Sequence, residues 1–390
     1  MAEEVSSTFL LILIIGKVFT GACNAITAKL QDMTIDKFTG REFFHPYFQT
    51  FVMFIAEFLC LVAFFSLFKL SAGFKADVIK GREEARKKGV TKECPFYIPL
   101  LPTLCDISAT NLSYASLTYM ASSIAVMLNG ALPIFTAILS VIFLKRKLWE
   151  HHYLGLFLLV IGIGTVGFSA LMEAKSEGSN VLLGLILKIV SLSITAVQYT
   201  VEEKILTKSY IHPLKMVGFE GFWGLFLSVI VMFVASNIPC DNEREYCNMG
   251  YLENPHNAIY DIMHDEWLWL FIILGIISLG FANFFGLSVT KYLSSLTRSV
   301  LGILTPVLVW LFDMAFLGRK FYWLQFLGFS LVVIGNFIYN EVMEVPGFDK
   351  HTKKKLAAME PLLKDTIPDK IENETDSCLS SEPITQEQTP

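Results

Sequence analysis

Residues 50–65 read TFVMFIAEFLCLVAFF and contain one charged side chain, Glu57, between two uncharged runs. An α-helix needs about 20 apolar residues to cross the roughly 30 Å of hydrocarbon in a bilayer. Because the uncharged sequence continues on both sides, we predict that residues 47–70 span a membrane. A carboxylate at the centre of such a helix costs about 2.5–3.5 kcal/mol on insertion scales, so Glu57 needs a structural or functional reason.

The same apolar pattern recurs along the chain, of which 53% is hydrophobic and only 17% charged. Backbone groups in lipid must be satisfied within the protein, so these segments are expected to be helices. The result is an all-α polytopic membrane protein, and a net charge of -5 gives no sign of a nucleic-acid partner. The first segment follows no basic region or small-residue cleavage site, which favours a retained helix. The predicted crossings are 8–30, 47–70, 97–119, 122–144, 153–172, 181–203, 216–236, 267–290, 295–317 and 321–342.

The basic residues predict the topology. Ten crossings place both termini on one side, and most Lys and Arg side chains of the loops fall on that side. The positive-inside rule therefore places both termini in the cytosol and the acidic loop 237–266 in the lumen. This loop contains CDNEREYC, and an oxidising lumen favours a disulfide between Cys240 and Cys247. Two free thiols are the alternative.

An internal repeat relates the two halves of the chain. When the sequence is aligned with itself, Pro133 meets Pro306, and LGLFLLVIG at 154–162 meets LGFSLVVIG at 327–335. More weakly, two HP pairs, at 45–46 and 212–213, each open a helix with one central carboxylate. These carboxylates are Glu57 and Glu220. Further aligned pairs are Asn111 with Asn283, Ser116 with Ser288, and Gly130 with Gly302.

Each repeat contains five crossings, and an odd number forces the two copies to point in opposite directions across the membrane. We therefore predict two inverted five-helix repeats, at 1–173 and 174–345, followed by a disordered cytosolic tail at 346–390. Two inverted halves allow two conformations of similar energy that open to opposite sides of the membrane. This is the physical basis of alternating access in secondary transporters.

Four motifs of the chain resemble a known group of proteins. In order they are FHPYFQTFVMFIAEFLCLVAFF, LPTLCDISATNLSYASL, VEEKILTKSYIHPLKMVGFEGFWG and FFGLSVTKYLSSLTRSVL. The chain is similar to the drug/metabolite transporter superfamily, most closely to the F subfamily of solute carrier family 35. More distantly it resembles the chloroquine-resistance-transporter group. The resemblance implies a ten-helix carrier of small molecules in a lysosomal or vacuolar membrane. It also reveals departures, because Asn129 and Thr305 stand where the subfamily commonly has arginine. The Gly-Ala-Leu-Asn-Lys motif of nucleotide-sugar transporters is absent, which argues against such a substrate.

Polar residues within the predicted helices mark a candidate substrate cavity. On the first helix they recur at spacings of three and four, which places them on one face. Pro133 and Pro306 interrupt the helical hydrogen-bond ladder at matched positions, as is typical of a central binding site. The alternative is that small polar residues only hold helices together. The predicted cavity residues are Asn24, Thr27, Asp106, Thr110, Asn129, Gln198, Glu202, Asn283 and Thr305.

Two hypotheses account for Glu57 and Glu220. Each carboxylate accepts hydrogen bonds from a neighbouring helix as a structural element, or the two titrate as the site changes sides and couple transport to protons. Lys17 lies deep in the first helix, where Asp106 or one of the glutamates is the candidate partner. Arg298 is interpreted as an anchor at the cytosolic surface.

These patterns favour a secondary active transporter that moves a small polar metabolite across an endomembrane, lysosomal or vacuolar first and Golgi second. The alternatives are a nucleotide-sugar exchanger of the Golgi or ER, and an intramembrane enzyme that uses Asp106 and Glu57. His151 and His152 lack the spacing of a zinc motif, and we expect no metal and no cofactor. The fifth and tenth helices carry almost no charge, so they are expected to face membrane lipid or to form a homodimer contact.

Overall fold

A computed structural model describes residues 7–339, apart from 36–39, 41, 88, 91, 118, 121–124, 126–127, 145–149, 175–180, 241–246 and 317–322. Within these residues the secondary structure is helical, with isolated bridges and no extended strand. Seven of the helices (α1, α2, α7, α8, α9, α11 and α12) are long and apolar enough to cross a membrane, and α6 and α13 are shorter apolar helices. The chain is therefore a polytopic membrane protein. The predicted tail at 346–390 lies outside the described residues.

Among the described residues each predicted crossing overlaps a helix, although only the seven helices named above are long and apolar enough to be candidate spans. Two helices, α3 and α10, lie outside the predicted crossings because they are polar and short. The helices are α1 Ser7–Asp32, α2 Pro46–Leu70, α3 Ala72–Lys87, α4 Leu100–Leu117, η1 Asn129–Ala131, α6 Leu132–Leu144, α7 Glu150–Ala174, α8 Val181–Lys208, α9 Pro213–Ala235, α10 Pro255–His264, α11 Glu266–Tyr292, α12 Ser295–Phe316 and α13 Trp323–Tyr339.

Local sequence fixes where several helices begin. Pro46 opens α2 and Pro213 opens α9, in the first turn, where a missing N–H costs nothing. The side chain of Asp265 accepts hydrogen bonds from the backbone N–H groups of Trp267 and Leu268 at the start of α11. An N-cap of this kind contributes about 1 kcal/mol. The matched HP pairs therefore act as helix starts in both halves.

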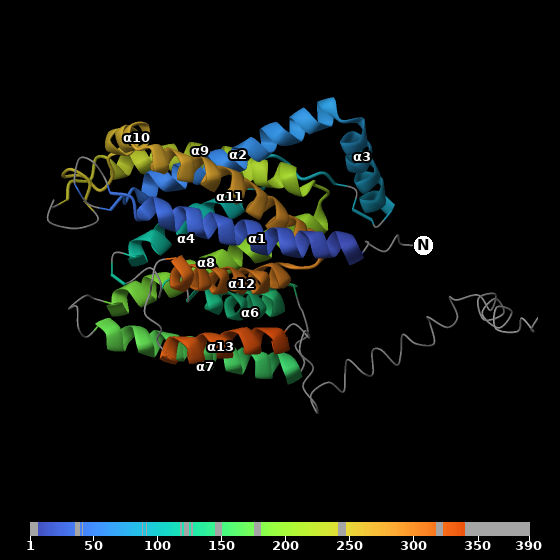
Figure 1. Cartoon of the computed structure of the whole chain (residues 1–390). Coiled ribbons are helices and arrows are strands. Elements are labelled where there is room, and N and C mark those ends of the chain that lie inside the picture. The colour runs from blue at the N-terminus through green and yellow to red at the C-terminus, as the bar shows by residue number, and fades with distance from the viewer. Residues whose placement is uncertain are drawn as a thin grey trace, which may run out of the picture.

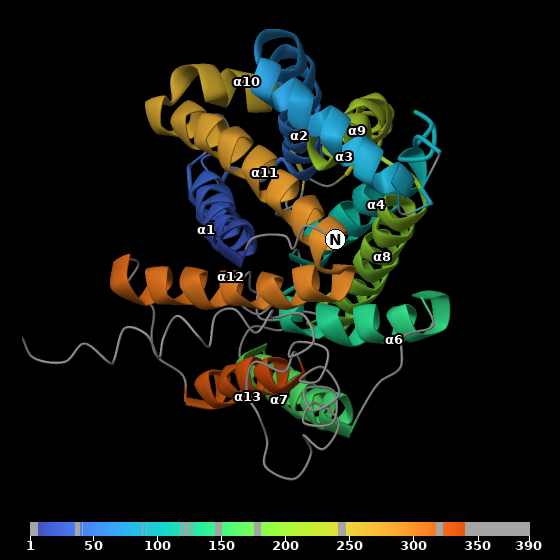
Figure 2. The same ribbon diagram turned by 90° about the vertical axis from the view of Figure 1, so that its right-hand side faces the viewer.

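The helices form a bundle in which α6 and α12 cross at a steep angle to α2 and α9 (Figures 1 and 2). At one end α3 turns away from the end of α2, and α10 lies at the opposite end (Figure 1). The most extensive helix contacts are α7 with α13, α2 with α9, α1 with α11, and α4 with α8. Figure 2 shows α7 and α13 as an outer pair beside α6 and α12, with α2 and α9 on the other side of the bundle.

Glycines set two of these contacts. A Cβ added to Gly155 would lie 2.6 Å from the carbonyl oxygen of Gly335, and one added to Gly162 would lie 2.7 Å from that of Gly328. The helices α7 and α13 therefore pack antiparallel with their backbones touching, which only small residues permit. On the α2–α9 interface, a Cβ at Gly221 would lie 2.5 Å from the carbonyl carbon of Glu57.

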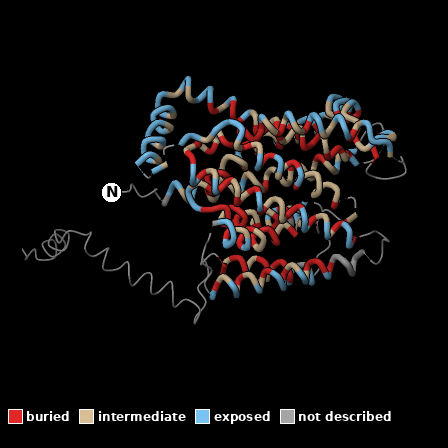
Figure 3. Tube along the Cα trace, turned by 180° about the vertical axis from the view of Figure 1, so that it is seen from behind, coloured by how far each residue is buried: buried red, intermediate tan, exposed pale blue. Residues whose placement is uncertain are grey.

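Burial follows the pattern of a protein surrounded by lipid. Large apolar side chains such as Phe19, Phe157 and Phe233 are exposed on the outer helix faces, whereas charged side chains such as Glu57 and Glu202 are buried. Figure 3 shows the buried stretches on the inward side of the helices and the exposed stretches on the outside. The polar residues of the crossing helices are thus gathered inside the bundle.

Candidate functional site

Glu57 lies at the middle of α2, where its side chain is only 2% exposed. The side-chain amide of Asn283 on α11 donates a hydrogen bond of 2.7 Å to Oε1 of Glu57. The other oxygen, Oε2, has no hydrogen-bond partner among the described residues. Its surroundings are shaped by Gly221 of α9, because no other residue would let the two backbones approach so closely. Of the two buried oxygens of Glu57, one therefore accepts a hydrogen bond and the other has no donor among the described residues.

The second carboxylate of the matched pair, Glu220, projects from α9 and is 6% exposed. Its Oε1 atom also has no hydrogen-bond partner among the described residues. Glu220 lies within electrostatic range of Glu57, as do Asp106 of α4 and Glu202 of α8. The acidic residues that were predicted separately on α2, α4, α8 and α9 thus form one cluster.

An ion pair joins α8 to α12 inside the bundle. The guanidinium of Arg298 donates to a carboxylate oxygen of Glu202, and both side chains are at least 95% buried. Gln198, one turn earlier on α8, donates to the other oxygen of Glu202 at 3.0 Å. The centre of the Arg298 guanidinium lies 3.9 Å from the ring centroid of Tyr199, within the range of a cation–π contact. Loss of one partner of such a pair costs about 3–5 kcal/mol, because the other charge stays buried.

The next residue of α8, Glu203, binds the first residue of α12. Its carboxylate accepts hydrogen bonds from the backbone N–H of Ser295, at 2.9 Å, and from the hydroxyl of the same serine. A carboxylate at a helix N-terminus also interacts favourably with the helix dipole. The paired acids of α8 therefore fix the start of α12, and they place Arg298 one turn further along.

Lys17 on α1 reaches the same region from the other side. Its ammonium donates to the backbone carbonyl of Ala282 on α11 at 3.3 Å. A Cβ added to Gly286 would lie 3.4 Å from the Lys17 nitrogen and 3.0 Å from Nε of Arg298. Glu202 lies within electrostatic range of Lys17, but no ion pair joins them among the described residues. Two cations thus flank Gly286, and of these only Arg298 forms an ion pair with a described residue.

The other predicted cavity residues occupy different surroundings. On α4, Thr110 donates to Asp106 at 3.3 Å. On α1, Thr27 donates to the carbonyl of Asn24 in its own helix. Thr305 of α12 faces α1, since a Cβ on Gly21 would lie 3.0 Å from the Thr305 hydroxyl.

The two prolines differ in their local structure. Asn129 lies in the 3₁₀ turn η1, and Pro133 follows in the first turn of α6. Pro306 instead lies inside α12, which continues on both sides of it. The matched positions in the repeat therefore have unequal backbone conformations.

Sequence reasoning assigned Arg298 to the membrane surface and made no assignment for Lys188. Lys188 of α8 is 6% exposed and donates to the hydroxyl of Ser113 on α4 at 2.7 Å. The signal for Arg298 was available in part, because an arginine inside a predicted crossing normally faces the bundle interior. Its partner, 96 positions away, could not be identified from one sequence.

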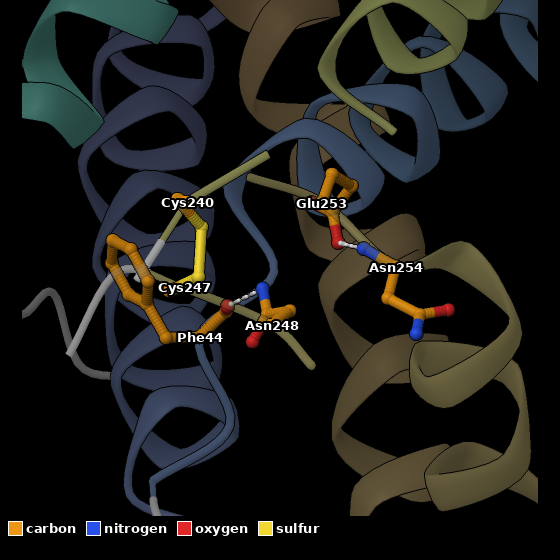
Figure 4. The surroundings of a disulfide bond; sticks show 6 residues. All are labelled: Phe44, Cys240, Cys247, Asn248, Glu253 and Asn254. Atoms are coloured by element: carbon orange, nitrogen blue, oxygen red, sulfur yellow. Dashed lines mark hydrogen bonds between the residues drawn. A yellow bond between two sulfur atoms is a disulfide. The ribbon is translucent and has the colours of Figure 1, made fainter. Parts of the chain in front are cut away.

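A disulfide joins Cys240 and Cys247 at the end of the bundle that holds α10 (Figure 4). Beside it, the side-chain amide of Asn248 donates to the carbonyl of Phe44 at 2.9 Å. Glu253 accepts hydrogen bonds from the first N–H groups of α2, those of Tyr47 and Phe48, at 3.1 and 3.2 Å. The disulfide-bonded segment is therefore attached to the start of the helix that contains Glu57.

A cleft of about 400 Å³ between α1 and α12 is separate from this polar cluster. Its lining is apolar, so it suits membrane lipid better than a polar solute. The lining residues are Phe19, Ala22, Cys23, Ile26, Leu308, Leu311, Phe312, Ala315 and Phe316.

Comparison with known proteins places the chain among transporters. The model of the Triose-phosphate Transporter family matches residues 34–340. The chain is 34% identical over 334 residues to solute carrier family 35 member F6 of Mus musculus, covering 82% of this chain and 86% of the mouse protein. The human protein of that name is likewise 34% identical, over 335 residues. A crystal structure with 12% sequence identity aligns with a TM-score of 0.55 over 86% of this chain and 99% of its own, which supports the fold alone.

Proposed function

Because the chain belongs to the triose-phosphate transporter family, we propose that it is a secondary active transporter that moves a small polar metabolite by alternating access. Family membership identifies a multi-pass membrane transporter of small solutes. It sets aside the intramembrane enzyme that the sequence left open with Asp106 and Glu57. The mechanism, the coupling and the membrane are the parts that we propose.

The packing of the helices is the observation that carries the mechanism. The first five crossings would be α1, α2, α4, η1 with α6, and α7, and the second five α8, α9, α11, α12 and α13. Exchange of the two sets converts the α1–α11 contact into the α8–α4 contact. The same exchange leaves three contacts unchanged, because each of them joins two corresponding helices. These contacts are α2–α9, α6–α12 and α7–α13. Two inverted repeats around an axis in the membrane plane would have this pattern.

The glycines of the outer pair support the same axis. In the sequence repeat Gly155 aligns with Gly328, and Gly162 aligns with Gly335. The close contacts are Gly155 with Gly335 and Gly162 with Gly328, so exchange of the halves converts one contact into the other. The antiparallel direction of α7 and α13 is the direction expected for the last helices of two inverted halves.

We further propose that Glu57 and Glu220 couple transport to protons. Both carboxylates are buried, each retains an oxygen without a hydrogen-bond partner among the described residues, and they lie on helices that touch at Gly221. The competing hypothesis is that both are structural. Glu57→Gln separates the two: if Glu57 is a coupling residue, whatever uptake the variant retains no longer depends on a pH gradient. Uptake with unchanged pH dependence would end the coupling hypothesis.

A substrate screen tests the function as a whole. The purified full-length chain in liposomes would be incubated with a metabolite extract, with and without a proton gradient, and the contents analysed by mass spectrometry. We expect accumulation of at least one small polar solute relative to protein-free liposomes. Exchange of nucleotide sugars would instead support the alternative exchanger, and no accumulation of any solute would overturn the proposal.

The proposed membrane is lysosomal or vacuolar, with the Golgi second and both termini in the cytosol. The cytosolic side would then include α3, where Lys75, Lys80 and Arg82 are located, and the opposite end would include the disulfide. The outer faces of α7 and α13 expose Phe157 and Trp323, and they would contact lipid or a second copy of the chain. Co-localisation of the tagged protein with lysosomal markers, and cross-linking across these faces, test the two statements.

A further inference from the structure

The charges of the cluster around Glu57 do not balance. Four carboxylates on four helices lie in one electrostatically connected cluster, and two cations accompany them. The carboxylates are Glu57, Asp106, Glu202 and Glu220, and the cations are Lys17 and Arg298. Uncompensated charge within a membrane is costly, so an excess of two carboxylates requires protons or a bound cation.

The hydrogen bonds show which carboxylates carry the excess negative charge. Glu202 is occupied on both oxygens, by Arg298 and by Gln198. Asp106 accepts from Thr110. In contrast, Oε2 of Glu57 and Oε1 of Glu220 are buried without a partner among the described residues.

Arg298 lies within electrostatic range of both carboxylates, but no cation of the described residues forms an ion pair with these two oxygens. Arg298 pairs with Glu202 and lies over the ring of Tyr199, and its Nε has no hydrogen-bond partner among the described residues. Lys17 donates to a backbone carbonyl on α11 and lies beside Gly286. Asn283, the closest neutral donor, already binds Oε1 of Glu57. The touching helices α2 and α9 thus carry two buried acceptor oxygens that no donor of the described residues satisfies.

One position of α12, one turn from Arg298, has open space beside it. Gly302 lies one turn after Arg298, and no atom of the described residues lies within 4 Å of the position of an added Cβ. Thr305, almost one turn further along, continues this face of α12 towards α1. An opening next to a site with excess negative charge suits a solute with positive charge.

We propose that the cargo is a small organic cation, and that an ammonium group of this solute binds between the carboxylates of Glu57 and Glu220. The inference rests on the transport function proposed above and specifies the charge of the solute. The charged groups that face the bound ammonium would be Asp106 of α4, Glu202 of α8, Arg298 of α12 and Lys17 of α1. The Arg298–Glu202 pair would remain in place.

Four compounds with the same four-carbon chain and different charge test the proposal. They are putrescine, a dication; 4-aminobutyrate, a zwitterion; succinate, a dianion; and 1,4-butanediol, which is neutral. Binding to the purified full-length protein would be measured as a thermal shift, and transport as uptake into liposomes. We expect putrescine to bind at least about tenfold more tightly than the other three compounds, which corresponds to about 1.4 kcal/mol.

Two variants connect the selectivity to the carboxylates. Glu57→Gln and Glu220→Gln keep the side-chain shape and are expected to lose the putrescine response, whereas Glu266→Gln on the exposed start of α11 should retain it. Elution as a monodisperse peak at the wild-type position would show that the variants fold. Equal responses to all four compounds, preference for succinate, no response to putrescine, or full retention in the Glu220 variant would each overturn the proposal. If the liposome screen finds another transported solute in that case, the transport function stands and only the cationic cargo is lost.

Discussion

The side-chain amide of Asn283 donates a 2.7 Å hydrogen bond to Glu57, although the two residues are 226 positions apart in the sequence. This contact ties α11 to α2 inside the bundle. The repeat places Asn111 at the position that corresponds to Asn283, but no hydrogen bond joins Asn111 to Glu220 among the described residues. The two halves thus share a pattern of residues without sharing every contact.

This asymmetry predicts unequal effects of two matched substitutions. Asn283→Ala removes the hydrogen-bond donor of Glu57 and leaves a buried acceptor unsatisfied, which costs about 1–3 kcal/mol. Asn111→Ala should cost less, because the Asn111 side-chain oxygen already has no partner. Thermal unfolding of both variants in detergent measures the difference. Equal losses of stability would contradict the assignment.

Much of the fold could be predicted from apolar runs alone. The crossing predicted at 47–70 is found at Pro46–Leu70, because a bilayer-length run bounded by proline and lysine leaves little freedom. The crossing predicted at 181–203 was too short, since α8 continues to Lys208. The last predicted residue, Glu203, is buried because Ser295 satisfies it from another helix. A sequence pattern does not reveal such a long-range partner.

The site could be predicted only in part, for the same reason. The structure brings Asp106 and Glu202 near Glu57 and Glu220, because all four are polar side chains on inward helix faces. Arg298 was instead assigned to the surface, since positive residues near helix ends commonly anchor there. Its burial depends on Glu202 and Tyr199, which lie on a helix distant in the sequence.

Glu253 should be important for stability although it lies outside the crossing helices. It accepts hydrogen bonds from two N–H groups of α2, and its Oε1 lies 2.6 Å from Nδ1 of the buried His45. Glu253→Ala would leave these groups unsatisfied and is expected to cost about 2–4 kcal/mol. Glu266→Ala, an exposed acid in the first turn of α11, is the matched control and should change stability by less than about 1 kcal/mol. Similar unfolding temperatures for the two variants would exclude the capping role.

The disulfide should protect the neighbouring loop from unfolding. A cross-link that closes a loop of this length stabilises by about 2 kcal/mol through loop-closure entropy. The double variant Cys240→Ser, Cys247→Ser is therefore expected to unfold at lower temperature and to be cleaved faster between α9 and α10. Limited proteolysis with and without a reducing agent checks this, because reduction should affect the wild type and not the double variant. Reactivity of both thiols before reduction would disprove the bond.

His212 predicts a pH dependence of stability at the start of α9. Burial and the neighbouring Lys291 ammonium lower the pKa of His212 to about 4, compared with about 6.5 in an unfolded chain. Between these values the unfolded chain binds more protons, so this residue makes the folded state less stable as the pH falls from about 6.5 to about 4. His212→Asn keeps a good N-cap without titrating, and its stability should decline less with acid. Parallel stability curves for the wild type and the variant would refute this origin.

Substitution of two glycines tests whether solute passes beside α12, because neither substitution is expected to disturb the fold. Gly302 on α12 and Gly164 on α7 both have open space at the position of an added Cβ, but Gly302 lies beside Arg298 and Gly164 is exposed on the outside. Neither Gly302→Leu nor Gly164→Leu should therefore destabilise the protein. If solute passes beside α12, the Gly302 variant should lose most uptake, at least tenfold, while the Gly164 variant transports normally. Uptake measured in liposomes containing equal amounts of folded protein decides the matter, and normal transport by Gly302→Leu would place the path elsewhere.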